Sequence, residues 1–169
     1  VPENGVWPDA ILEIGPQRPK GGRIVWEWHM WDHLVQNTSP TLPNFANPSD
    51  RPERIDINGD VLGVATPPKV PPADIFHTNS VAYNAELDQI VLSVPRFNEL
   101  WVIDHGTTTA QASGSAGGRS GKGGDLLYRW GNPQAYGRGT DTDRHLGFHH
   151  DARWIPRGSP GGGNLMVFS

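Results

Sequence analysis

Four polar residues stand out because their side chains could bind and transfer an anionic group: His77, Asn79, Arg96 and His150. A neutral imidazole is a nucleophile near neutral pH, since the pKa of histidine is ordinarily about 6.5. An arginine guanidinium is a planar, permanent cation that can bind two oxygens of an anion at once. An asparagine amide can donate to further oxygens. These residue types suit transfer of an anionic group through a histidine nucleophile.

Each of these residues also has a purely structural interpretation. His150 directly precedes Asp151 and could be held by it at the start of a strand. Asn79 could satisfy a turn, and Arg96 follows Pro95 at the exit of a strand, where arginines are usually solvated. The residue types alone therefore leave the chemical and the structural interpretations open.

A metal centre is the weaker interpretation of the remaining histidines. His145 and His149 lie four residues apart, which would suit a metal if both lay on one helical turn. Gly147 between them disfavours that turn. We predict no metal site and no cofactor.

Strand patterns surround the candidate residues. Four short apolar runs separated by turn residues predict one four-stranded antiparallel sheet. Two runs before them and two after them predict two further strand pairs. The runs are 77–84, 89–94, 99–104 and 125–131 for the sheet, 10–14 and 23–29 before it, and 151–156 and 164–168 after it.

Internal repetition favours a β-propeller over a single sandwich. Segment 21–28 echoes segment 123–130, and His77 and His150 precede similar strand pairs 73 residues apart. His77 and Asn79 alternate along the first run and would share a face of the sheet. We therefore predict an all-β fold, a partial β-propeller domain over residues 1–169 that holds about two to three blades.

Two connections are long. Segment 30–76 is rich in proline, which excludes central strands and long helices, although 31–36 could hold a helical turn. Segment 106–124 is rich in Gly, Ser and Thr, and we predict that it is exposed and flexible.

Composition excludes several classes of protein. The net charge is −4 with no basic block, which argues against nucleic-acid binding. There is no cysteine, so the chain has neither disulfides nor thiolate metal sites. No apolar run approaches 18 residues, so we predict no membrane span.

The ends of the chain suggest a piece of a longer protein. The chain begins at Val1 and ends inside a strand-like run, 165–169. We expect truncation at both ends, and a piece that is inactive or poorly stable by itself. Whether it forms a homo-oligomer is left open.

Seven segments in order carry a resemblance to a known family. They include 26–34 (WEWHMWDHL), 77–84 (HTNSVAYN), 123–133 (GGDLLYRWGNP) and 150–156 (HDARWIP), with 51–58, 87–93 and 98–105 between them. Taken together they resemble the bacterial aryl-sulfate sulfotransferase family, over most of the chain from about residue 20. Each motif is weak alone, and the ordered series is fairly specific.

The resemblance implies a six-bladed propeller that moves a sulfuryl group from an aryl sulfate to a phenol, without a nucleotide donor. It implies a sulfohistidine intermediate in a ping-pong cycle, no cofactor, and a periplasmic or secreted location. His150 matches the family's nucleophile, and His77, Asn79 and Arg96 match its substrate-binding residues. A further family histidine matches His33, with His29 as the alternative.

The chain also departs from the family pattern. Members often have Asp-Trp before the first motif histidine, where this chain has Ile75-Phe76, and Gln before the nucleophile, where it has His149. Two other functions therefore stay open: a non-catalytic propeller that serves as a binding scaffold, and a different propeller enzyme such as a quinone- or metal-dependent oxidoreductase or a lyase.

Overall fold

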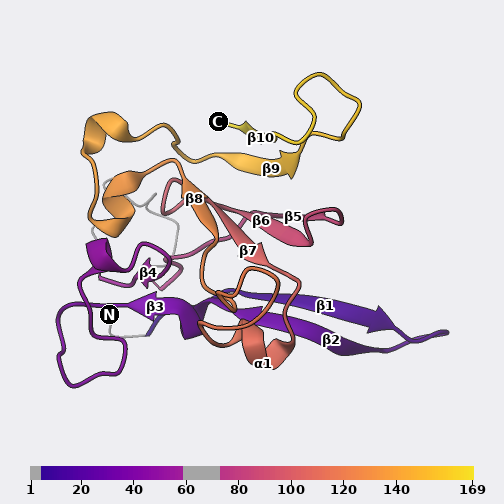
Figure 1. Ribbon diagram of the computed structural model, residues 1–169, viewed down its shortest axis with the longest axis horizontal. Coiled ribbons are helices and arrows are strands. Elements are labelled where there is room, and N and C mark those ends of the chain that lie inside the picture. Colours follow the sequence, from indigo (N-terminus) through magenta and orange to yellow (C-terminus); the bar gives the residue numbers. More distant parts are fainter. Residues whose placement is uncertain (1–4, 59–72) are drawn as a thin grey trace.

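The computed structural model describes residues 5–58 and 73–169 and is rich in β-structure, with 34% strand and 12% helix. Its main elements are three antiparallel sheets, which confirms the β class (Figure 1). The described residues do not close into a barrel or a propeller. The strands are β1 (Ala10–Pro16), β2 (Gly22–His29), β3 (Leu34–Val35), β4 (Ile55–Asp56), β5 (Ser80–Asn84), β6 (Gln89–Val94), β7 (Glu99–Asp104), β8 (Tyr128–Trp130), β9 (His150–Trp154) and β10 (Leu165–Phe168).

The central sheet has four strands in the order β5-β6-β7-β8, each antiparallel to the next, as predicted. Its strands are shorter than the apolar runs at the two edges, where β5 begins at Ser80 and β8 begins at Tyr128. Strands β6 and β7 are almost wholly buried along their length. A strand buried on both faces must lie between two other layers, because its alternate side chains point in opposite directions.

The two strand pairs supply those layers (Figure 1). The β1–β2 hairpin packs on one face, where Trp26 and Trp28 join Leu92, Trp101 and Ile103 in one apolar cluster. The β9–β10 hairpin packs on the opposite face. There Ala152, Leu165 and Val167 contact a second cluster that includes Val91, Leu100 and Val102.

The segment after β7 is folded, so the prediction of an exposed and flexible 106–124 is wrong in part. It contains the helical turn α1 (Thr109–Ala112), which Thr108 and Gln111 cap reciprocally. Ala112 is fully buried, and the carbonyl of Gly124 accepts a hydrogen bond from the Trp28 indole at 2.8 Å. A Cβ on Gly124 would lie 2.0 Å from the Ala112 carbonyl oxygen, so glycine here permits close packing.

The first long connection is irregular over its described part, 30–58. It contains the predicted helical turn as η1 (Met30–His33), then η2 (Pro48–Asp50) and the short parallel pair β3–β4. The proline cluster predicted at 67–72 lies outside the described residues. The remaining short helices, η3 (Pro133–Tyr136) and η4 (Asp141–Asp143), follow β8. No helix in the described ranges is long and apolar enough to cross a membrane.

A buried ion pair ties the central sheet to this connection. Glu99 is fully buried and accepts from Arg129 Nε at 3.0 Å, from Arg129 Nη2, and from the Trp101 indole at 2.8 Å. Arg129 Nη1 also donates to the carbonyls of Pro52 and Arg54, at 3.1 and 2.9 Å. Burial raises the pKa of Glu99, and the Arg129 guanidinium opposes that rise.

Candidate active site

Strands β5, β6 and β7 of the central sheet, and β9 beside it, begin or end at the same end of the sheet, next to the β6–β7 turn. Asn79 directly precedes β5, and its backbone N–H donates to the carbonyl of Ser93 in β6 at 3.0 Å. His149 Nε2 lies 3.0 Å from the carbonyl oxygen of Glu99, the first residue of β7. His150 begins β9 and contacts Asn79. The fold therefore gathers residues from three distant segments at this end.

Asn79 and His150, two of the predicted site residues, are in direct contact. The Asn79 side-chain nitrogen lies 2.8 Å from the His149 carbonyl oxygen and 2.9 Å from His150 Nδ1. Because a carbonyl only accepts, it orients the NH2 group, and the second hydrogen then faces His150 Nδ1. His150 Nδ1 also lies 3.3 Å from the His149 carbonyl, to which it can donate in its other tautomer.

Both arrangements use Nδ1 of His150 and leave Nε2 for another molecule. When Nδ1 carries the proton and donates to His149, Nε2 has a free lone pair and can act as a nucleophile. When Nε2 carries a substituent, Nδ1 can accept from Asn79 instead. His150 is exposed, and no described residue forms a hydrogen bond to its Nε2. Asn79 is thus placed to stabilise the Nε2-substituted ring.

His149 is a site residue that the sequence did not single out beyond a weak metal interpretation. Its side chain is fully buried, and Nε2 donates to the Glu99 carbonyl, so Nδ1 holds the lone pair. That Nδ1 has no hydrogen-bond partner among the described residues. Burial lowers the pKa of His149, and the neighbouring His150 adds a smaller decrease, so His149 is neutral at physiological pH.

The β6–β7 turn carries two more buried polar side chains. Arg96 is only 6% exposed, and its Nη2 has no partner within residues 5–58 and 73–169. Asn98 is fully buried in a left-handed conformation (φ 55°), and both polar atoms of its amide also lack a described partner. A buried cation and an unsatisfied amide side chain on the same turn suit an anion with several oxygens. Asparagine is common in turns, so its residue type alone could not have marked Asn98 as a candidate. Its position in the β6–β7 turn of the sheet was the signal that could have done so.

Arg96 nonetheless does not touch the nucleophile candidate in this structure. It lies at the same end of the sheet as Asn79 and His150, but no described hydrogen bond or ion pair joins them. The convergence of Arg96 and His150 within a few ångströms stays a prediction.

His77 is placed differently from the prediction. It lies before β5 rather than in it, with a left-handed backbone (φ 55°) that breaks the two-residue alternation. The prediction that His77 and Asn79 share a strand face is therefore wrong. The ring is half exposed, and Nδ1 is 2.5 Å from Asp74.

His33, the preferred match for the fifth site residue, points into the interior, so that prediction is corrected. Its side chain is fully buried, with Nδ1 2.9 Å from Asp125 and Nε2 2.8 Å from the Ala112 carbonyl oxygen. The ring also stacks on Trp28, with centroids 5.3 Å apart. Both nitrogens are occupied by the protein, which leaves none for a substrate.

His29, the alternative, is better placed. It ends β2 opposite Ala10 in the register of the hairpin. The adjacent Asp9 accepts a hydrogen bond from the Thr78 amide at 2.7 Å, which brings this end of the hairpin to the segment 77–79. The His29 ring is partly exposed and lies 3.0 Å from Glu27.

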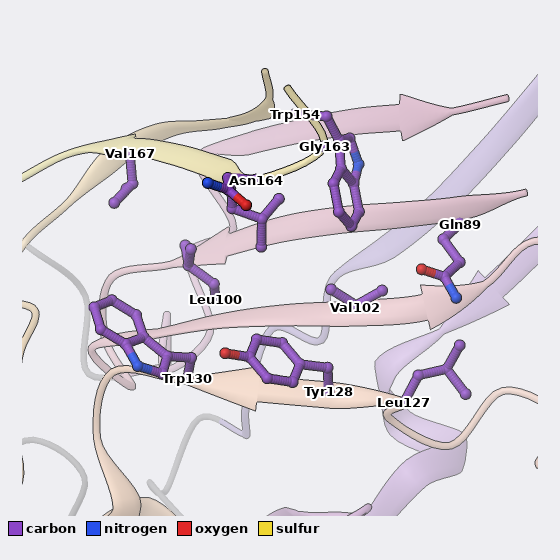
Figure 2. A pocket seen from close by; sticks show the side chains of 11 residues that line it. Gln89, Leu100, Val102, Leu127, Tyr128, Trp130, Trp154, Gly163, Asn164 and Val167 are labelled. Atoms are coloured by element: carbon purple, nitrogen blue, oxygen red, sulfur yellow. The ribbon is translucent and has the colours of Figure 1, made fainter. Parts of the chain in front are cut away.

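A cavity of about 580 Å³ lies away from these residues, between β7–β8 and the β9–β10 hairpin, with mostly apolar walls (Figure 2). None of the candidate residues lines it. Among the described residues, no group of three or more His, Asp or Glu side chains is arranged to hold a metal ion.

Comparisons with known proteins add no family assignment. The chain matches no protein-family model, no curated protein and no solved structure at a significant level. The function must therefore be inferred from the resemblance of its motifs and from the geometry at the end of the central sheet.

Proposed function

We propose that this chain is part of a β-propeller of the aryl-sulfate sulfotransferase type, in which Nε2 of His150 accepts a sulfuryl group from an aryl sulfate and passes it to a phenol. One observation carries the proposal: the Asn79 amide lies 2.9 Å from His150 Nδ1, although the two residues are 71 positions apart. The resemblance had named both for one site.

The first half of the reaction follows from the free Nε2. Its lone pair attacks sulfur, an N–S bond forms, and the S–O bond breaks with its electron pair on the departing phenolate. Nδ1 then accepts from the Asn79 amide once its proton has left to solvent. Arg96 and Asn98 would donate to the sulfuryl oxygens, where negative charge is spread over three atoms.

The second half reverses these bonds. The oxygen of an acceptor phenol attacks the same sulfur, the N–S bond breaks and its electron pair returns to Nε2. The hydroxyl proton of the phenol is released to solvent. The free histidine is restored, which gives a ping-pong cycle.

A binding scaffold without catalysis is the second candidate, and one observation favours it. No described contact joins Arg96 to His150, and the ring of His77 contacts Asp74. In that case the Asn79–His150 contact only holds β9 against β5, together with the 2.9 Å hydrogen bond from the Ala152 amide to Ser80.

The half-reaction separates the two candidates, since labelling needs only the aryl sulfate and the residues at this end of the sheet, whereas the inactivity expected of the isolated piece concerns complete transfer to a phenol. The folded chain is incubated with 4-nitrophenyl sulfate without phenol, and peptides are examined by mass spectrometry for one added sulfuryl group. We expect the label on His150, loss of the label in His150→Gln, and an unchanged label in the control His145→Gln, which alters an exposed histidine that stacks on Trp130. Asn79→Ala should slow labelling by about tenfold, the value of one hydrogen bond. A folded chain with no label on His150 contradicts the proposal and leaves the scaffold.

A further inference from the structure

His77 and Asp74 form a pair that has no part in the reaction as proposed above. Nδ1 of His77 lies 2.5 Å from an Asp74 carboxylate oxygen, three positions earlier in the chain. An ionised carboxylate only accepts hydrogen bonds, so Nδ1 carries a hydrogen and Nε2 is the nitrogen that remains for another molecule. No residue in the described part of the chain forms a hydrogen bond to that Nε2, and the His77 side chain is 52% exposed.

The segment that carries this pair is fixed at the end of the central sheet. Phe76, next to His77, is fully buried and stacks on Phe97 in the β6–β7 turn, with ring centroids 5.8 Å apart. On the other side of His77, the backbone N–H of Thr78 donates to Asp9 at 2.7 Å. Because both neighbours are held, the left-handed backbone at His77 (φ 55°) sets the direction of its side chain.

His77 is also close along the chain to the residue that contacts the proposed nucleophile. Asn79, which lies 2.9 Å from His150, follows His77 by two residues, and two residues of chain span at most about 7 Å. The rings of His77 and His150 share no described hydrogen bond. In-line group transfer puts the attacking atom and the departing oxygen on opposite sides of the central atom, so a group that serves the departing oxygen should lie apart from the nucleophile. His77 meets both conditions.

Departure of a phenolate is the step that needs a proton donor. An unsubstituted phenol has a pKa of about 10, like the tyrosine side chain, so its anion is a strong base near neutral pH and a poor leaving group. General acid catalysis speeds such a step by about 100- to 10,000-fold. Arg96 keeps its proton and His149 is buried and neutral, so neither can donate one. His29 is partly exposed, but the contact that brings it to this end goes through Asp9, which leaves His77 as the stronger candidate.

We propose that Asp74 is a positioning residue, which holds His77 so that its Nε2 exchanges a proton with the phenol oxygen of the substrate. This inference rests on the proposed function. As the S–O bond breaks, doubly protonated His77 gives its Nε2 hydrogen to the departing phenolate and keeps the electron pair of that N–H bond. When an acceptor phenol attacks the sulfur, the same lone pair takes its hydroxyl proton. One proton therefore passes between the ring and the two phenols without release to solvent, while the Nδ1 hydrogen stays on Asp74.

The test compares two donors in the half-reaction that labels His150. The 4-nitrophenolate anion is a weak base and departs without a proton, whereas the phenolate of phenyl sulfate departs slowly unless it is protonated. His77→Gln should slow labelling from phenyl sulfate by about 100-fold or more and keep labelling from 4-nitrophenyl sulfate within about threefold of wild type. Asp74→Asn should slow labelling from phenyl sulfate by about tenfold, since the amide no longer fixes Nδ1 as the protonated nitrogen. Retained labelling from 4-nitrophenyl sulfate shows that each variant is folded.

Asp141→Asn is the matched control. Asp141 is 70% exposed in η4 and pairs with Arg144 three positions later, the same spacing as in the proposed pair. Both donors should label this variant at the wild-type rate. An equal loss with both donors in His77→Gln, or no loss with either, overturns the proposal. So does a donor-dependent loss in His29→Gln that His77→Gln lacks, which would place the proton donor at the end of β2.

The pair can also be tested without any donor. Nitrogen chemical shifts of isotope-labelled histidine, measured above the ordinary histidine pKa of about 6.5, report which ring nitrogen carries the hydrogen. The His77 signal, identified by its loss in His77→Gln, should show the hydrogen on Nδ1 in the wild type and on a mixture of the two nitrogens in Asp74→Asn. A wild-type ring with its hydrogen on Nε2 overturns the proposal. Absence of label on His150 from both donors contradicts the proposed function itself, whereas labelling in which every variant treats both donors alike contradicts only this inference.

Discussion

Replacing Arg129 by Met should strongly destabilise the protein, because it leaves the Glu99 carboxylate buried without its cation. Arg129 donates twice to Glu99 and stacks over Tyr136, with its guanidinium carbon 4.3 Å from the ring centroid. Glu99 is fully buried and keeps only the Trp101 indole as a side-chain donor in the variant. Breaking one partner out of a buried pair costs about 3–5 kcal/mol.

The loss of stability in Arg129→Met should depend on pH. Burial already raises the pKa of Glu99, and removing the guanidinium raises it further, so the folded variant binds a proton at mildly acid pH that the unfolded chain does not. The folded state of the variant therefore gains stability as the pH falls toward the pKa of Glu99 in the unfolded chain. The loss relative to wild type should be largest near pH 8 and smaller near pH 5.

Urea unfolding at fixed protein concentration measures both effects. Glu99→Gln with Arg129→Met is the control, because it removes both charges and keeps an acceptor for the Trp101 indole. The double variant should recover much of the stability and lose the pH dependence. A loss below about 1 kcal/mol for Arg129→Met, or one that grows on acidification, would refute the account of a buried pair.

Two further variants test the packing around the site. Burial lowers the pKa of His149 below its ordinary 6.5, so the unfolded chain binds a proton there more readily than the folded protein does. The wild type should therefore lose stability as the pH falls through 6.5. In urea titrations His149→Gln should lose less stability over the same pH range. An unchanged slope would show that His149 does not titrate between the two states. Gly124→Ala should cost about 1–3 kcal/mol by thermal unfolding, because its Cβ would lie 2.0 Å from the Ala112 carbonyl oxygen. Gly147→Ala, where nothing lies within 4 Å, is its control, and equal melting temperatures for the two would contradict the packing explanation.

Sequence and structure agree on one pair of the predicted site residues, whose roles stay a prediction. Asn79 and His150 were named from their motifs, and they are in contact. His33 was predicted wrongly, since its ring is bonded to Asp125, 92 positions away, and sequence gives no sign of that separation. From the sequence, His149 received only a weak metal interpretation. Its burial, which makes Nδ1 a neutral acceptor, arises from the packing of the sheets and could not be predicted from the sequence.

The order of the strands along the chain could be predicted from the sequence, because strands and turns depend on patterns of apolar and turn residues over a few positions. The runs that form β6 and β7 could be read without any partner. Which face meets which layer, and which polar groups meet at the sheet end, depended on tertiary structure. Stacked sheets bring side chains together according to their position in the layers. A left-handed backbone at one residue, His77, turns its side chain away from the strand face that it would share with Asn79 by simple alternation.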